Sequence, residues 1–412
     1  METHLADWIR DTSTGDEVES ILRSCVHCGF CNATCPTYQL LGDELDGPRG
    51  RIYQIKQVFE GAQPTATTRL HLDRCLTCMN CETTCPSGVR YGRLVDIGRG
   101  EVEKRVPRST GEAIRRTVLR GVLTRRWLFG PAVQLGRALR PLLPRTLREK
   151  LPRARDAGAT PVRMHMRKVL LPGACVQPAL IPAIDAASAR VLDALGIEAL
   201  RAPQAGCCGA IDYHLSAHDA ARTRARRNVD AWWPHVEAGA EAIVSNASGC
   251  GAMLKDYAHL LRDDPAYAQK AKRIAGMTRD LVELVAPSAS ALAALCTESV
   301  PARIAFHPPC TLQHSQKIRG AVESLLTQLG VTLVPVAESH LCCGSAGTYS
   351  ILQPELSQRL RVRKLENLQR GRPELILSAN IGCLAHLETG TEVPVRHWIE
   401  WVDAAIARRP LA

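Results

Sequence analysis

The sequence predicts a multidomain α+β protein, in which a mainly helical N-terminal domain precedes two homologous α/β domains with parallel sheets. Three observations support this fold class. A run of four cysteines closed by a proline occurs at 25–36 and returns at 75–86. Beyond residue 165 a set of motifs repeats, so that Cys310 follows Cys175 by 135 residues. Each repeat alternates short apolar runs with amphipathic stretches, which is the pattern of strands and helices in a parallel sheet.

These patterns divide the 412 residues into four parts. We expect a helical domain at 1–105, a basic linker or docking segment at 106–165, a first α/β domain at 166–300 and a second at 301–412. The first twenty residues are acidic and show neither the basic nor the apolar region of a signal peptide. A disulfide framework, which belongs to small secreted domains, is therefore disfavoured as the purpose of the cysteines.

The two cysteine runs have the spacing C-x2-C-x2-C-x3-C-P, which is typical of bacterial ferredoxins that bind [4Fe–4S] clusters. Structural zinc sites more often use two separated C-x2-C pairs, so zinc is the weaker alternative. In two-cluster proteins the fourth cysteine of each run binds the other cluster. We therefore expect a first cluster on Cys25, Cys28, Cys31 and Cys85, and a second on Cys75, Cys78, Cys81 and Cys35.

The segment between the two runs predicts a helix. Ile52, Ile55 and Phe59 recur at helical spacing within 48–61, which makes the ferredoxin domain mainly helical. Arg49 and Arg51 lie at the start of this helix. A solvated position is favoured for both arginines over a position beside a cluster.

Each repeat reads β-α-β-α-β-α. In the first copy the expected strands are 168–173, 197–200 and 241–245, and the expected helices are 181–196 and 221–236. The cysteines of both copies follow strands, and ligands of parallel sheets bind beyond the carboxyl ends of strands. The candidate third redox site consists of Cys175, Cys207, Cys208, Cys250, Cys310, Cys342, Cys343 and Cys383. Buried core thiols are the alternative, and Cys296, outside both patterns, is assigned to the core.

The motifs "CVHCGFCNATCPTY", "DGPRGRIYQIK" and "CLTCMNCETTCPSGVRYG", together with the paired "CCG" loops, resemble the iron–sulfur subunits of bacterial glycolate oxidase. The resemblance covers nearly the whole chain. It also extends to the third subunit of anaerobic glycerol-3-phosphate dehydrogenase and to the B and C subunits of heterodisulfide reductase. It implies that partner flavin subunits oxidise a 2-hydroxy acid such as glycolate. This chain would then carry the electrons toward the membrane quinone pool.

One departure from this group concerns the "CCG" domains. The heterodisulfide reductase version ends in C-x-x-C and uses five cysteines, whereas here Ala247 and Asn380 replace the first cysteine of that pair. Four thiols remain in each copy, enough for a cluster with four cysteine ligands. Metal binding by these domains stays open at this point. A thiol/disulfide redox enzyme is the alternative function, and the iron–sulfur subunit of a glycerol-3-phosphate or lactate dehydrogenase is another.

The expected cofactors are two [4Fe–4S] clusters and a further cluster in the "CCG" domains if those bind metal. No flavin, nicotinamide or ATP motif occurs, so we expect no flavin or nicotinamide on this chain. An iron–sulfur sensor is disfavoured because no DNA-reading module is recognised. Four histidines lie near "CCG" cysteines, but none is assigned a catalytic role: His214, His218, His307 and His340.

The net charge of +11 is concentrated in one segment. Between residues 115 and 155 there are eleven Arg and one Lys against Glu149 alone, together with Trp127, Leu128, Phe129 and repeated leucines. A linker or partner-docking surface is favoured, an anionic membrane surface comes next, and no nucleic acid is expected as a partner. No apolar run is long enough for a transmembrane helix. The expected location is the cytoplasm, with peripheral attachment to the inner face of the cell membrane as one outcome.

Overall fold

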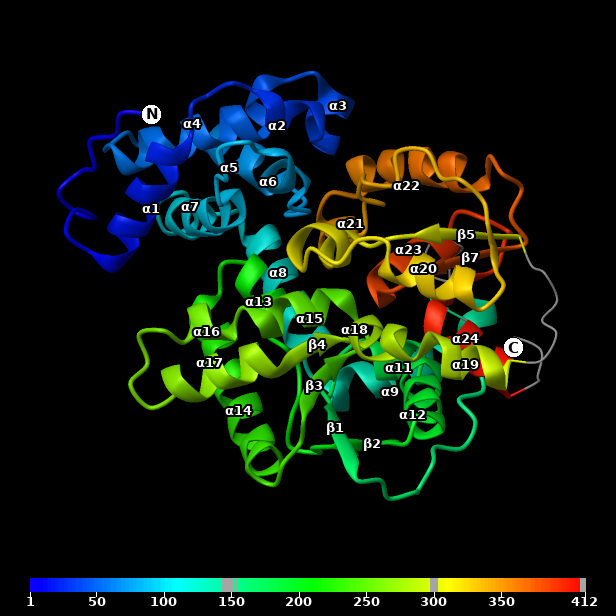
Figure 1. The fold of residues 1–412 in the computed structure, drawn as a ribbon. Helices are drawn as coiled ribbons and strands as arrows, with labels where there is room; N and C mark the ends of the chain where they lie inside the picture. Colours follow the sequence, from blue (N-terminus) through cyan, green and yellow to red (C-terminus); the bar gives the residue numbers. More distant parts are fainter. Residues whose placement is uncertain (143–150, 153, 297–302, 408–412) are drawn as a thin grey trace.

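The computed structural model describes residues 1–142, 151–152, 154–296 and 303–407. Figure 1 shows the N-terminal helices as one body that lies against two α/β halves. The N-terminal helices are α1 (Ser13–Ser24), α2 (Phe30–Ala33), α3 (Pro36–Leu41), η1 (Glu44–Asp46), α4 (Pro48–Phe59), α5 (Ala66–Asp73), α6 (Asn80–Thr84) and α7 (Tyr91–Arg105). This arrangement confirms the predicted fold class.

Helix α4 coincides with the helix predicted between the cysteine runs. Pro48 begins it, as suits a residue without a backbone N–H, and Ile52, Ile55 and Phe59 form its buried face. This face packs against α7, whose Leu94 lies in the same core. The two helices hold the cysteine loops on a shared apolar base.

The first α/β half is a four-stranded parallel sheet in the order β2-β1-β3-β4. Its strands are β1 (Arg167–Leu171), β2 (Ile197–Arg201), β3 (Ala242–Ser245) and β4 (Thr278–Asp280). Its helices are α11 (Gln177–Leu180), α12 (Ala183–Ala194), α13 (Ala210–His214), α14 (His218–Glu237), α15 (Ser248–Lys255), α16 (Tyr257–Leu260), α17 (Ala268–Met277), α18 (Leu281–Val285), η3 (Ala286–Ser288) and α19 (Ala289–Leu295). The three predicted strands and two predicted helices are present, and β4 is an addition.

The second half repeats this topology in the order β6-β5-β7-β8. Its strands are β5 (Arg303–His307), β6 (Thr332–Leu333), β7 (Leu375–Ser378) and β8 (Val395–His397). Its helices are η4 (Thr311–Ser315), α20 (Ala321–Gln328), α21 (Tyr349–Leu352), α22 (Pro354–Gln369), α23 (Ile381–Glu388) and α24 (Trp398–Ile406). The fourth strand of each half lies at a sheet edge next to the third.

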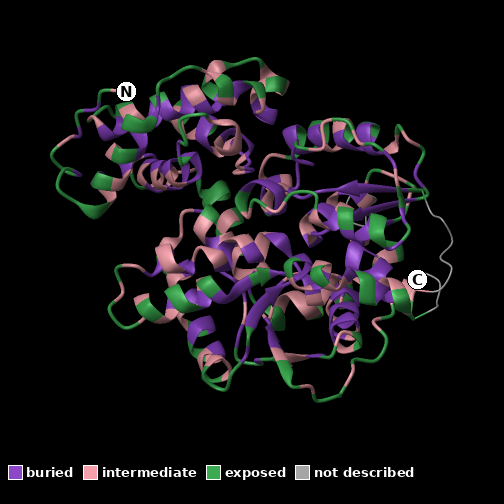
Figure 2. Cartoon of the chain, viewed as in Figure 1, coloured by how far each residue is buried: buried purple, intermediate pink, exposed green. Residues whose placement is uncertain are grey.

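The two halves share a hydrophobic core. One cluster of buried side chains contains Val169 and Ile184 of the first half together with Phe306 and Trp398 of the second. Helices α12 and α24 form the main helix contact between the halves. One hydrophobic core therefore extends across the boundary, and Figure 2 marks the buried residues of both halves in purple.

The basic segment forms α8 (Thr110–Leu123), α9 (Arg126–Ala138) and η2 (Arg140–Leu142), while residues 143–150 and 153 lie outside the described part of the chain. Some arginines of this segment form ion pairs within the chain: Arg116 pairs with Asp73, and Arg120 pairs with Asp212. Several apolar side chains of the two helices are exposed, among them Val118, Trp127 and Leu135, whereas Val133 of α9 is buried. Within the described residues, no helix combines the length and the apolar character needed to cross a membrane.

Candidate metal centres

The two cysteine runs have the same backbone conformation. In each run the residues before and after the central cysteine adopt a left-handed conformation: His27 and Gly29 around Cys28, and Thr77 and Met79 around Cys78. A short helix, α2 or α6, begins directly after each of these turns. Left-handed residues bend the chain sharply, so successive cysteine side chains of a run are directed to one side of the loop. The spacing seen in the sequence thus produces a concave, thiol-lined loop.

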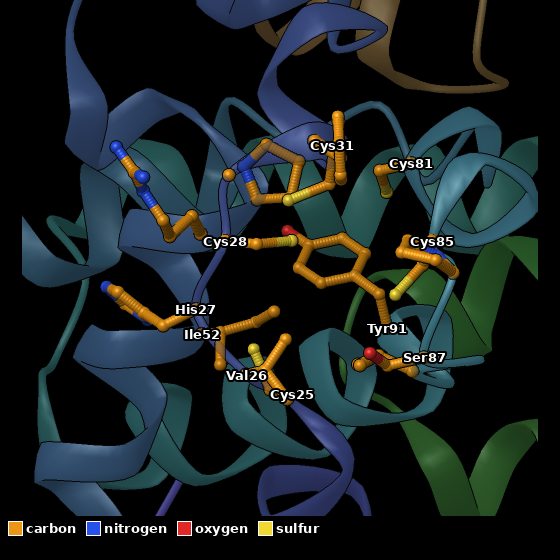
Figure 3. A pocket seen from close by; sticks show the side chains of 16 residues that line it. Cys25, Val26, His27, Cys28, Cys31, Ile52, Cys81, Cys85, Ser87 and Tyr91 are labelled. Carbon is orange, nitrogen blue, oxygen red and sulfur yellow. The ribbon is translucent and has the colours of Figure 1, made fainter.

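The first loop lines a pocket that contains every thiol assigned to the first cluster. Cys25, Cys28, Cys31 and Cys85 line it, and Cys81 contributes from the second run. Figure 3 shows the sulfur atoms of Cys25, Cys28, Cys31 and Cys85 around the same space. Burial, together with the charge of the Cys25 thiolate, raises the pKa of Cys31 to about 11. At neutral pH this shift keeps Cys31 protonated, and a bound cation would favour its thiolate.

The second pocket contains the thiols assigned to the second cluster: Cys35, Cys75, Cys78 and Cys81 line it. Burial raises the pKa of Cys78 and of Cys81 well above the usual value. Four soft thiolates around each pocket are the donor set that a [4Fe–4S] cluster requires, so the residues present fit that cofactor. Since Cys35 comes from the first run and Cys85 from the second, each pocket joins both runs.

Tyr91 lies between the two pockets and lines both. Its hydroxyl donates a hydrogen bond to the Cys75 sulfur at 3.5 Å, and its side chain is buried. Cys81 also lines both pockets. The two cluster sites are therefore separated by little more than one aromatic ring and one thiol.

Arg51 is buried beside the second pocket, so the solvated position predicted for it is wrong. Only 1% of the residue is exposed, and it lines the pocket. Its guanidinium donates hydrogen bonds to the His71 carbonyl at 2.7 Å and to the Asp46 carboxylate at 3.3 Å. Burial alone would lower the pKa of Arg51, but the neighbouring Tyr91 and Cys75 raise it, so the side chain remains charged. Arg49 lies near the first pocket and pairs with Glu44 at 2.6 Å.

In the first α/β half the structure brings the four candidate thiols into one series. Each thiol is close enough to affect the pKa of the next: Cys207 acts on Cys175, Cys208 on Cys207, and Cys250 on Cys208. The thiols lie after β1, β2 and β3, at the carboxyl edge of the sheet where ligands were expected. They are buried apart from Cys250, whose exposure is intermediate.

In the second half the equivalent thiols form the same series. The Cys310 and Cys342 sulfurs are 4.0 Å apart, and Cys342 and Cys383 both lie close enough to Cys343 to affect its pKa.

Two basic side chains that the sequence did not single out as ligands lie beside these thiols. Ligand atoms of His307, Cys343 and Cys383 are within 4.8 Å of one another, and all three residues are buried. The Lys364 ammonium donates to the Glu338 carbonyl at 2.6 Å, and burial lowers the pKa of Lys364 to about 8 against the opposing effect of the Cys343 thiolate.

The second-cluster pocket adjoins the cysteines of the second half. Leu76 and Cys78 belong to the same buried apolar cluster as Cys342 and Leu360, with Cys310 packed against it. These thiols are close enough to affect one another electrostatically. The charge of Cys310 contributes to the raised pKa of Cys78, and the charge of Cys78 contributes to the raised pKa of Cys342. Such proximity of residues more than 230 positions apart was not predictable from the spacing within either motif.

The other residues considered in the sequence have structural surroundings. Cys296 packs at the edge of the shared core, as assigned. His214 shares a hydrogen bond with Asp96 at 3.3 Å, and His314, which the sequence did not single out, shares one with the hydroxyl of Thr83 at 2.9 Å. These contacts join the N-terminal helices to the α/β halves.

Comparison with known proteins agrees with this architecture. Residues 21–89 match the 4Fe-4S dicluster domain, and residues 170–255 and 304–388 match the cysteine-rich domain. The chain is 53% identical over 409 residues to the glycolate oxidase iron–sulfur subunit of Escherichia coli K12, with 99% of this chain and 100% of that protein covered. It is 29% identical to the probable glycolate oxidase iron–sulfur subunit of Bacillus subtilis 168, covering 91% and 90%. It is 27% identical to lactate utilization protein A of an Exiguobacterium strain, covering 58% and 99%.

Proposed function

The chain belongs to the family of glycolate oxidase iron–sulfur subunits, and from this we propose that it carries electrons from a flavin subunit that oxidises glycolate toward the membrane quinone pool. As an iron–sulfur subunit of a hydroxy acid oxidoreductase it requires a site for electron carriers but none for the organic substrate. A [4Fe–4S] cluster bound in each pocket would supply a one-electron carrier. The residues of this chain set where the carriers lie and how they are shielded from water.

One observation supports the proposal above all: the cysteine sites are contiguous. The first pocket shares Cys81 and Tyr91 with the second, and the second adjoins the second α/β half through Cys78 and Cys310. A conduit needs such short separations, because bound carriers exchange electrons only when they are close. A single structural metal site would not require three cysteine sites next to one another.

The ligand assignment follows from the pockets. We propose that Cys25, Cys28, Cys31 and Cys85 hold the first cluster and that Cys75, Cys78, Cys81 and Cys35 hold the second. We further propose that at least one "CCG" quartet holds a third redox centre. Converging thiols repel one another once deprotonated, and a bound metal removes that repulsion. Arg51 keeps a fixed positive charge beside the second pocket, which favours the reduced state of the site it faces.

The basic helices offer a surface for attachment. Trp127 on α9 is 71% exposed, and Val118 on α8 and Leu135 on α9 are exposed as well. Arg125 precedes α9, and Arg126 begins it. Aromatic, aliphatic and cationic side chains together suit the interface of an anionic membrane. We propose that this surface places the subunit on the cytoplasmic face of the membrane, near the quinone pool.

The function is tested on the purified chain and on its complex. The chain alone should bind no flavin and should not reduce an artificial acceptor with glycolate. In a complex with its flavin subunits, the double change Cys28→Ser and Cys78→Ser should abolish quinone reduction, while glycolate still bleaches the flavin absorbance. Cys296→Ser, at a thiol on the edge of the core, is the matched control and should leave both reactions unchanged. Glycolate oxidation by the isolated chain would refute the proposal.

A further inference from the structure

One difference between the cysteine sites of the two α/β halves concerns a potential metal ligand. The residue three positions before the first cysteine is Pro172 in the first half and His307 in the second. Both lie at the carboxyl end of a central strand: Pro172 directly follows β1, and His307 is the last residue of β5. Only the second half of the described structure therefore offers an imidazole at this place. The thiols follow the same order in both halves, so His307 is a potential metal ligand that the second site has in addition.

His307 is the last residue of β5 and points toward the thiols. It pairs in register with Ser378, the last residue of β7, whose hydroxyl donates to the His307 carbonyl at 2.9 Å. One of its ring nitrogens and the sulfurs of Cys343 and Cys383 all lie within 4.8 Å of one another. These three side chains come from β5, from the loop after β6 and from α23. Three separate elements thus converge on one point at the carboxyl edge of the sheet.

The imidazole has no partner of its own. His307 is 1% exposed, and neither ring nitrogen has a hydrogen-bond partner among the described residues. A buried polar atom without a partner costs about 1–3 kcal/mol. A metal ion bound to the lone pair of one nitrogen would remove part of that cost. Neutral imidazole and thiolate are both ligands that iron accepts in iron–sulfur proteins.

We propose that His307 is a nitrogen ligand to an iron of the redox centre in the second α/β half, on the same metal ion as Cys343 and Cys383. This inference rests on the proposed third redox centre and assigns that centre to the second half. The Cys310 and Cys342 sulfurs, 4.0 Å apart, would complete the ligand set on the side that faces the ferredoxin domain. The histidine takes the role of the fifth cysteine that Asn380 replaces.

A nitrogen ligand at this site would affect electron transfer from the ferredoxin clusters. Cys310 and Cys342 lie against Cys78 of the second-cluster pocket, so the centre is the next carrier along the row. Replacing thiolate by neutral imidazole removes negative charge from a centre and raises its reduction potential. The buried ammonium of Lys364 acts in the same direction. The second half would therefore accept electrons from the ferredoxin clusters more readily than a centre held by thiolates alone.

The test measures histidine nitrogen at the metal, independently of activity. The full chain is prepared anaerobically with reconstituted clusters, once with natural histidine and once with histidine labelled with nitrogen-15. Pulsed EPR of the reduced protein should show a nitrogen-14 coupling that is replaced by a nitrogen-15 coupling after labelling. The coupling should disappear in His307→Leu and in His307→Cys. His307→Cys should retain iron close to that of the unmodified protein, because cysteine restores a ligand.

Two controls keep the result interpretable. His340→Gln changes an exposed histidine of the same cysteine loop and should preserve the coupling. The signals of the two ferredoxin clusters show that each variant is folded, and the labelling experiment on unmodified protein needs no variant at all. Iron in excess of the roughly eight atoms of two [4Fe–4S] clusters, without histidine coupling, would overturn the ligand assignment alone. Iron limited to about eight atoms, or zinc in the second half, would overturn the third redox centre as well.

Discussion

At the scale of single residues, the cysteine loops contain backbone conformations that cost free energy. His27, Thr77 and Met79 have positive φ values, between 50° and 60°, although none of them is glycine. Such conformations cost on the order of 1 kcal/mol each and persist where the surrounding structure requires them. Here they turn the chain around the central cysteine of each run. The strain is thus located where a cluster would be bound, and ligation would offset it.

The crossed ligand assignment makes a prediction about Cys85. Cys85→Ser should perturb the cluster built on Cys25, Cys28 and Cys31, because Cys85 lines their pocket and is absent from the second. Mössbauer or EPR spectroscopy should show a changed or three-iron first cluster next to an unchanged second cluster. Cys35→Ser should produce the opposite pattern. A change confined to the second cluster in Cys85→Ser would contradict crossed ligation.

Gly344 makes a separate prediction about the close packing of the "CCG" loop. It has φ of 91°, and a Cβ there would lie 2.5 Å from the Ser357 carbonyl oxygen on α22. Gly344→Ala should destabilise the second half by about 2–4 kcal/mol, from left-handed strain and from overpacking. Gly347→Ala is the matched control, because Gly347 has φ of 63° but no atom within 4 Å of an added Cβ. It should cost only about 1 kcal/mol in denaturant unfolding. Equal losses for the two variants would disprove the packing argument.

The residues that the sequence predicted and those that it missed differ in kind. Cysteine ligands are identifiable because their spacing along the chain is itself the signal. Arg51 and His307 have no such signal. Arg51 is buried only because Asp46 and His71 bind it from other elements, and His307 becomes a ligand candidate only because Cys343 and Cys383 approach it. Contacts of this kind depend on tertiary packing, which no local pattern encodes.

At the scale of elements, length decided which strands were predictable. Strands β1, β2 and β3 have four or five residues, at least three of them apolar in each, and were predicted. Strand β4 has three residues, Thr-Arg-Asp, and β8 also has three. Neither contains enough residues to show an alternation of apolar and polar side chains. Their pairing with β3 and β7 is what makes them strands.

The end of β4 carries a buried carboxyl whose titration affects stability. Asp280 is 2% exposed, caps α18 and accepts a hydrogen bond from Gln316 of the second half at 3.2 Å. Burial raises its pKa to about 7, although the Val282 amide, Gln316 and Lys255 oppose the shift. The folded state therefore holds a proton that the unfolded state releases above its pKa of 3.8. The contribution is favourable at low pH and is lost as the pH rises from about 4 to about 7.

Asp280→Asn should remove this pH dependence. Relative to the unmodified chain, the variant should gain stability as the pH rises from 5 to 8, by at most about 4 kcal/mol. Thermal unfolding across that range measures the difference between the two proteins. Asp263→Asn, at an exposed carboxyl, should show no such trend. A difference that shrinks with increasing pH would have the wrong sign and refute the prediction.

Helices α8 and α9 make a prediction about membrane attachment. Trp127→Ala should weaken binding to vesicles that contain anionic lipid by about tenfold, since an inserted indole contributes roughly 1.5 kcal/mol or more. Binding should also weaken as salt is added, because the arginines act through screened charge. Val362→Ser, at an exposed apolar residue on α22, is the control. Vesicle binding that is insensitive to both Trp127 and salt would leave this surface without a membrane role.

At the scale of the whole molecule, the N-terminal domain contacts the two halves in different ways. It meets the first half through polar groups, among them Arg93 with Asp256 and Arg262 with Glu17. It meets the second half through polar contacts such as Thr83 with His314 and, in addition, through a buried apolar cluster that includes Cys78 and Cys342. The duplicated halves are therefore equivalent in fold but not in their relation to the ferredoxin clusters. This asymmetry agrees with an additional redox centre in the second half.

The core shared by the two halves makes a prediction about cooperativity. Trp398 on α24 is fully buried and belongs to the cluster that also contains Ile184 and Val191 of α12. Arg190 of α12 pairs with Asp403 of α24 at 2.7 Å across the same boundary. Because neither half encloses this core alone, the two halves should unfold together. Trp398→Ala should then destabilise both halves, by about 3–5 kcal/mol.

Hydrogen exchange of the full chain with its clusters distinguishes this expectation from independent folding. In Trp398→Ala the amides of β1 and β5 should lose protection by similar factors, although the change lies in the second half alone. Trp127→Ala, at an indole that is 71% exposed, should leave both strands protected as in the unmodified protein. Loss of protection confined to β5 would show that the halves are separate folding units. Joint loss would mean that the cysteine sites of both halves are held in place by one continuous core, so that a disturbance in either half displaces both sets of thiols.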